Sequence, residues 1–208
     1  MNPGYLSLVL LSITLILFAS GWKEIYVRSI SQNRILLFFI GWILLFSFEI
    51  KLPAVQINWV FAGISVLSLG IIIQTKGLFR KLHLLSIGLL LGSFHVLAME
   101  ILAMDPMMAV VSPQLDAVLF LVCVVLLLER RLWEQIASLS LGIIIGEIYS
   151  VLAHSMHQPL YFGGASFQDG WWLSVFAART FTLLLESLVK GFKAVCKALI
   201  AWKGGWRK

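Results

Sequence analysis

The chain has 208 residues, of which 60% are hydrophobic and 12% are charged, and its formal net charge is +6. This composition excludes an ordinary soluble domain, in which charged residues alone make up about a quarter of the chain. The positive charge does not indicate nucleic-acid binding either, because the basic residues lie in short clusters between apolar runs, as they do in cytoplasmic loops of membrane proteins.

Seven apolar runs are long enough to predict membrane-spanning helices, each of which needs about 20 residues. The first run has no positively charged segment before it and no small-residue cleavage site, so we expect a permanent span instead of a removed signal peptide. We therefore predict an all-α polytopic membrane protein. The spans lie near residues 4–22, 35–51, 54–74, 82–104, 113–129, 132–154 and 171–190.

The fifth run has the shortest apolar core, and its start depends on three residues. Ser112 is a favourable N-cap, Pro113 suits the first helical position, and Asp116 would lie in the first turn, where the helix dipole favours a carboxylate. We place the start of this helix at Pro113.

The connections between the runs predict the orientation of the chain. Lys and Arg side chains accumulate on the cytoplasmic side of membrane proteins. Of the 16 Lys and Arg residues, all except Lys51 and Arg179 fall in alternate connections or in the C-terminal tail. We expect the N-terminus outside and the C-terminus in the cytoplasm of a multi-pass plasma-membrane protein.

Small residues predict close packing of two spans. Gly88 and Gly92 lie four residues apart in the fourth span, and Gly142 and Gly146 do so in the sixth. This spacing lets helix backbones approach closely in lipid, so we expect the sixth span to be central. The sequence LSLGIII occurs at residues 67–73 and again at 139–145, which leaves open whether the chain contains an inverted repeat.

Ionisable residues in two spans are the main candidates for a polar core. In the seventh span Arg179, Thr182 and Glu186 share one helix face. Glu147 and His154 lie on the sixth span, which runs in the opposite direction, so Glu147 and Arg179 should reach a similar depth in the outer half of the membrane. Because each charge is costly alone in hydrocarbon, we predict that these two residues form an ion pair.

Two functions fit this polar set. The first is a non-enzymatic membrane component or assembly partner, in which the pair only fixes the packing of the helices. The second is a small transporter or channel, in which an outer-half cluster binds a cation or passes protons, since His titrates near neutrality. The candidates for either role are Glu147, Arg179, His154, His95, Glu100, Thr182 and Glu186.

No pattern of residues predicts a metal site, a cofactor or a catalytic centre. Glu147, His154 and His157 could ligate a metal in principle, but neither an HExxH motif nor a nearby Cys accompanies them. The chain has no Gly-rich phosphate loop beside its basic connections. The sequence GGAS at residues 163–166 falls in an outer loop, whereas an intramembrane serine protease needs its Ser on a buried helix. We assign no catalytic residue.

The C-terminal segment predicts a second structural part. Its apolar residues repeat at helical spacing, while lysines occupy another face, as in helices that lie on an anionic leaflet. We divide the chain into a seven-helix domain, 1–190, and a basic amphipathic tail, 191–208. The tail should contact the cytoplasmic leaflet through Lys190, Lys193 and Lys197. Another membrane protein or a second copy of the chain is the further expected partner.

The chain resembles a known family at three points. These are the NPG at residues 2–4, the GWKE at residues 21–24 that ends the first span, and the seven-span pattern. They resemble the YphA family, uncharacterised small polytopic membrane proteins of spore-forming Firmicutes. The resemblance covers nearly the whole chain and implies a Gram-positive plasma membrane. Because that family has no assigned activity, it implies no site residues.

Overall fold

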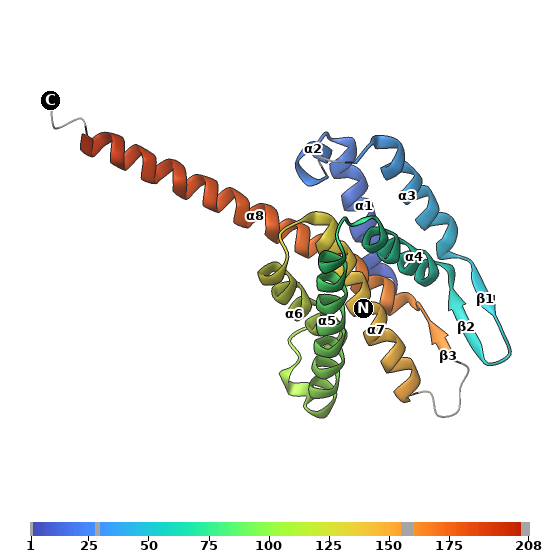
Figure 1. Ribbon diagram of the computed structural model, residues 1–208. Helices are drawn as coiled ribbons and strands as arrows, with labels where there is room; N and C mark the ends of the chain where they lie inside the picture. The colour runs from blue at the N-terminus through green and yellow to red at the C-terminus, as the bar shows by residue number, and fades with distance from the viewer. Residues whose placement is uncertain (1, 28–29, 155–159, 205–208) are drawn as a thin grey trace.

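The computed structural model describes residues 2–27, 30–154 and 160–204, and this part of the chain is mostly helical (Figure 1). The elements in chain order are α1 (Tyr5–Ala19), α2 (Lys23–Tyr26), α3 (Gln32–Phe46), β1 (Glu49–Lys51), β2 (Val55–Asn58), α4 (Trp59–Gln74), α5 (Leu78–Met104), the 3-10 helix η1 (Pro106–Met108), α6 (Pro113–Leu128), α7 (Leu132–His154), β3 (Leu160–Phe162) and α8 (Ala165–Gly204).

The seven longer helices follow the order of the seven predicted spans. Within the described residues, α5, α7 and α8 are long and apolar enough to cross a membrane. The other four, α1, α3, α4 and α6, are apolar but have only 15 or 16 residues. At 1.5 Å per residue they measure about 24 Å, somewhat less than the roughly 30 Å of a hydrocarbon core.

The centre of the fold is α7, which contacts α4, α5, α6 and α8, as the sequence predicted for the sixth span. Its closest partner is α5, and the glycines of the two helices interlock. A Cβ on Gly92 would lie 2.7 Å from Ile145, and a Cβ on Gly142 would lie 2.7 Å from Leu91. The predicted close packing of small residues is therefore confirmed, and both motifs are used inside one chain.

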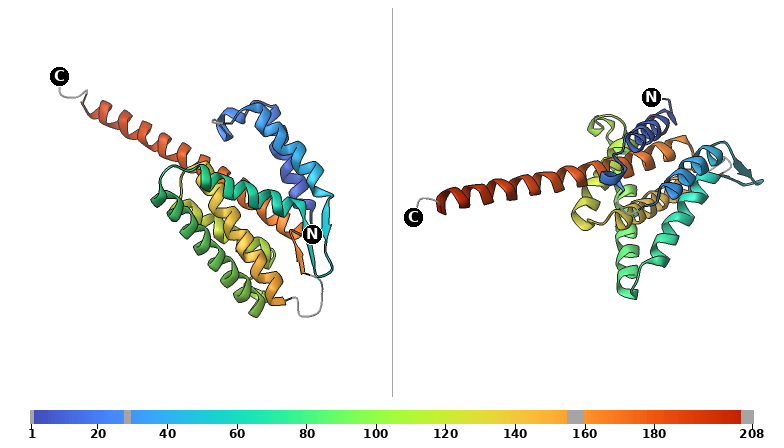
Figure 2. Two further views of the ribbon diagram at one scale, coloured as in Figure 1. Left: turned by 45° about the vertical axis from the view of Figure 1, so that its right-hand side comes forward. Right: turned by 90° about the horizontal axis from the view of Figure 1, so that it is seen from above.

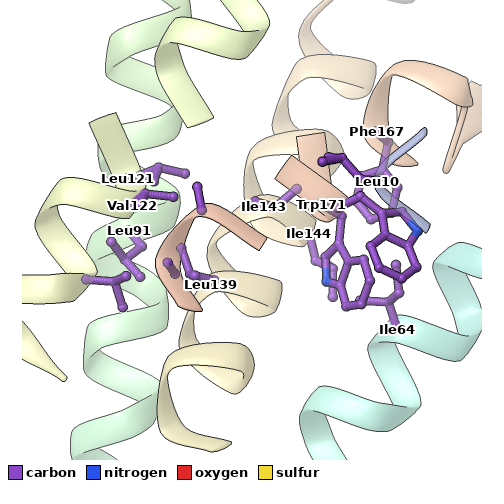
Figure 3. Close-up of a cluster of buried hydrophobic side chains, with 14 of the residues drawn as sticks. Leu10, Ile64, Leu91, Leu121, Val122, Leu139, Ile143, Ile144, Phe167 and Trp171 are labelled. Atoms are coloured by element: carbon purple, nitrogen blue, oxygen red, sulfur yellow. The ribbon is translucent and has the colours of Figure 1, made fainter. Parts of the chain in front are cut away.

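The buried apolar core lies on both sides of α7 (Figure 3). On one side Leu91 of α5 meets Leu121 of α6 and Leu139 of α7, all of which are fully buried. On the other side Trp171 of α8 packs among residues of α1 and α4. The α8 helix thus joins the α5–α6 side to the α1–α4 side.

Three short strands correct the all-α prediction and the bounds of two spans. Residues 49–51 and 55–58 form an antiparallel hairpin, and residues 160–162 add to β2 in parallel. The helix predicted as the second span therefore ends at Phe46 instead of residue 51, and the helix predicted as the third begins at Trp59 instead of residue 54. Pro53 and the β-branched residues of this segment favour strands over helix. Asn58 then caps α4 by accepting the Val60 N–H at 2.8 Å.

Two helix starts were predicted with different success. The α6 helix begins at Pro113, and the Ser112 hydroxyl accepts the Leu115 N–H, which confirms the predicted N-cap. The α8 helix begins at Ala165, six residues before the predicted start at residue 171. It continues without a break through residue 190 to Gly204 and projects well beyond the other helices (Figures 1 and 2).

Candidate functional site

The amino ends of α1 and α8 are joined by one carboxylate. Asp169 accepts the Gly4 N–H at 2.7 Å and the Ser7 N–H at 2.6 Å, and its side chain is almost fully buried. It lies in the second turn of α8. Because the first N–H groups of a helix have no partner within it, Asp169 serves as the N-cap of α1 from another element.

Glu147 lies at the same end of the bundle, close to the short sheet. Its carboxylate accepts the Gly163 N–H at 3.3 Å, directly after β3. In β3, Tyr161 donates to Glu49 of β1 at 2.9 Å, and burial followed by this hydrogen bond raises the pKa of the Tyr161 phenol. Lys51 pairs with Glu49 at 3.5 Å. The Glu147 contact joins α7 to the end of β3, and the other two contacts lie within the sheet.

Arg179 lies far from this group, and the predicted ion pair with Glu147 is wrong. Its Nε donates to the Tyr26 carbonyl at 2.6 Å, and its Nη2 donates to the Ile25 carbonyl at 2.9 Å. Arg179 is about 21 Å along α8 from Ala165, whereas Glu147 contacts Gly163 just before that helix. The early start of α8 thus places Arg179 nearer the opposite end, where it satisfies the last carbonyls of α2.

One turn further along α8, Thr182 forms a buried polar contact with α7. Gln135 of α7 donates to the Thr182 hydroxyl at 3.1 Å and to the Glu129 main-chain carbonyl at 2.7 Å. Thr182 in turn donates to the Ala178 carbonyl at 2.7 Å. The side-chain partner of Thr182 is therefore Gln135, which the sequence did not single out.

The remaining candidates do not form one site in the described residues. The His95 ring fills the space that a Cβ on Gly146 would need, and its Nδ1 is buried without a hydrogen-bond partner there. Glu100 is half-buried near the end of α5, and Glu186 is exposed on α8. His154 ends α7, but its side chain lies outside the described part, as does all of His157.

A charged cluster that the sequence did not reveal joins α5, α6 and α7 at the end of the bundle where Arg179 lies. Glu134 pairs with Arg80 and, at 3.8 Å, with Arg131, while Glu129 pairs with His83 at 3.3 Å. Both carboxylates are buried. Burial, followed by hydrogen bonding to and repulsion from Glu134, raises the pKa of Glu129. In the sequence, this cluster is indicated only by Glu129 and Glu134, the two acids on either side of Arg130 and Arg131.

At the same end, an apolar cavity of about 430 Å³ lies between α3 and the α7 and α8 helices, with α1 and α4 completing its walls. Arg179 is its only lining residue among the seven candidates. A second cavity of about 190 Å³ lies at the other end, beside Asp169 and Ser112. Of the other candidates, those whose side chains are described line neither of these two cavities: Glu147, His95, Glu100, Thr182 and Glu186.

Comparison with known proteins adds one assignment to this geometry. A family model described as YphA-like integral membrane protein matches residues 25–201. No curated protein and no solved structure matches the chain. The resemblance predicted from the sequence is confirmed.

Proposed function

The chain belongs to the YphA-like integral membrane proteins, and on that premise we propose that it crosses the plasma membrane seven times, with its N-terminus outside and its C-terminus in the cytoplasm. Seven apolar helices, three of them long enough to cross a membrane, follow one another along the described chain and support this arrangement. The basic residues support the proposed orientation. Arg80, Arg130 and Arg131 lie at the end of the bundle from which the basic part of α8 extends, as expected of the cytoplasmic side.

This orientation can be tested by cysteine labelling in intact cells. Both native cysteines, Cys123 and Cys196, are first replaced by Ala. A cysteine at Val110, which is highly exposed between α5 and α6, should then react with a membrane-impermeant maleimide. A cysteine at the exposed Arg130 should react only after permeabilisation. The reverse pattern would contradict the proposed sidedness.

Within the membrane we assign the protein a non-enzymatic role as an assembly partner. The observation that carries this role is the extension of α8. Leu188, Val189, Phe192 and Val195 are exposed on one side of it, while Lys190, Lys193 and Lys197 follow another. Such a helix presents an apolar stripe to a membrane-protein partner or a second copy, with its lysines toward the anionic cytoplasmic leaflet.

A photo-crosslinking residue at Phe192 tests the assembly role in living cells. We expect a discrete protein adduct from Phe192 and a much weaker one from Ser187, which is exposed on another part of the same helix. Adducts with lipid alone at Phe192 would mean that the extension only lies on the membrane, and the assembly role would be dropped.

A small transporter or channel is the second candidate, and His95 is the residue that favours it. Its buried Nδ1 lacks a partner in the described chain, and its ring packs against Gly146, next to Glu147. A titratable pair in the proposed outer half could bind a proton or a cation. Proton or cation flux into proteoliposomes that falls on Glu147→Gln would support transport. Equal background flux in both proteins would remove it.

A further inference from the structure

We propose that the 430 Å³ cavity holds one acyl chain of an anionic phospholipid, whose phosphate is bound by Arg34 and Arg179. We call this cavity the lipid crevice; it is lined by residues of α1, α2, α3, α4, α7, α8 and the segment between α2 and α3. The assignment of this lipid to the inner leaflet rests on the proposed orientation of the chain.

The walls of the lipid crevice fit a hydrocarbon chain. Phe38 of α3 lies 6.2 Å from Trp171 and 6.1 Å from Trp172 of α8, as measured between ring centroids, and these rings line one end. Ile136 of α7 and Val175 of α8 continue the apolar surface. The volume lies within the range of about 300–1,000 Å³ that ligand pockets occupy, which suits one chain better than a whole lipid.

The charge on the lining of the crevice selects an anion. Among the described residues, two charged side chains line it, Arg34 and Arg179, and none of the described lining residues is acidic. Arg34 is exposed at the start of α3 and forms no ion pair or side-chain hydrogen bond within the described chain. Arg179 uses Nε and Nη2 for the α2 carbonyls, which leaves Nη1 free of these contacts. Guanidinium groups bind phosphate oxygens well in this setting.

Native mass spectrometry of the purified full-length protein in mild detergent tests this assignment. The probes are dioleoyl phosphatidylglycerol, dioleoyl phosphatidylcholine, oleate and inorganic phosphate. The variants are Arg34→Gln, which removes one phosphate ligand, and Val175→Trp, which fills the crevice. The matched control is Arg130→Gln, because Arg130 is an exposed Arg at the same end that does not line the crevice.

We expect one phosphatidylglycerol to bind wild type about tenfold more tightly than phosphatidylcholine. Both lipids carry the same phosphate, but the choline cation of phosphatidylcholine cancels its charge and is repelled by the two guanidinium groups. Arg34→Gln should remove this preference, Val175→Trp should weaken both phospholipids, and Arg130→Gln should bind as wild type. Equal binding of both phospholipids to wild type would overturn the proposal. So would equal behaviour of Arg34→Gln and Arg130→Gln, or displacement of the lipid by oleate or millimolar phosphate.

The two proposals fail separately. If phosphatidylglycerol binds as expected but the cysteine labelling is reversed, the lipid crevice stands and only the leaflet changes. If the labelling agrees and the lipid preference is absent, the orientation stands and the crevice has no lipid role.

Discussion

The carboxylate of Asp169 lies 2.6 Å from the main-chain nitrogen of Ser7, so a residue of the last helix caps the first helix of the chain. This contact closes the bundle across 162 positions of sequence. It also fixes the amino ends of α1 and α8 at one level, because the same carboxylate binds the Gly4 N–H.

Asp169→Asn should destabilise the protein, because the amide keeps one acceptor oxygen but loses the charge and one of the two N–H partners. We expect the free energy of unfolding to fall by about 1–3 kcal/mol, the usual cost of a lost charge-assisted hydrogen bond at a buried site. Thermal unfolding in detergent measures the change. Asp105→Asn is the control, since its carboxylate is exposed. Equal effects of both substitutions would contradict the capping role.

Gly142→Ala should weaken the packing of α7 against α5. The added methyl would lie 2.7 Å from the Leu91 Cβ and 3.3 Å from the Gly92 main-chain nitrogen, so the helices must separate. Overpacking of this kind costs about 1–3 kcal/mol. Gly70→Ala in α4 meets nothing within 4 Å and should leave stability unchanged or slightly higher. A neutral Gly142→Ala would contradict the interlocked glycines.

Glu147 and Arg179 should act independently in a double-mutant cycle. Glu147 binds the main chain just before α8, whereas Arg179 lies about 21 Å along that helix and binds α2. The coupling energy between Glu147→Gln and Arg179→Gln should therefore stay below about 0.5 kcal/mol. Arg80→Gln with Glu134→Gln provides the positive control, because those two residues form an ion pair. Unfolding of the single and double variants in detergent supplies the energies. A coupling energy between Glu147 and Arg179 as large as that between Arg80 and Glu134 would contradict the structure.

The sequence predicted those features that depend on local pattern and helix length. Seven apolar helices occur in the expected order, α6 begins at Pro113, and the glycines at residues 88 and 142 lie in one close helix contact. Each of these follows from residues close together in the chain, or from the strong preference of small residues for helix contacts.

The sequence did not predict features that depend on contacts between distant segments. Strand β2 pairs with β3 about a hundred residues later, and neither strand alternates over enough residues to be recognised alone. The six-residue error in the start of α8 shifts its side chains by about 9 Å along the axis. That shift is enough to move Arg179 from the level of Glu147 to the carbonyls of α2.

The buried pair Glu129 and Glu134 should make stability depend on pH. The pKa of Glu129 is raised above its ordinary value of 4.5, chiefly by burial and then by Glu134, while His83 and Arg80 act in the opposite sense. The folded protein therefore holds this proton more tightly than the unfolded chain. Its stabilising contribution is fully present below pH 4.5 and is lost as the pH rises through the folded pKa.

Glu129→Gln mimics the protonated carboxyl at every pH, so the variant should not lose stability as the pH rises through the pKa of Glu129. Compared with wild type, the variant should gain relative stability as the pH is raised above 4.5, where wild type begins to ionise a buried group beside Glu134. Unfolding midpoints across the acid-to-neutral range measure the difference. Glu24→Gln, at an exposed acid of α2, should show no such trend. A difference between Glu129→Gln and wild type that stays constant with pH would mean that His83 and Arg80 compensate the buried charge in full.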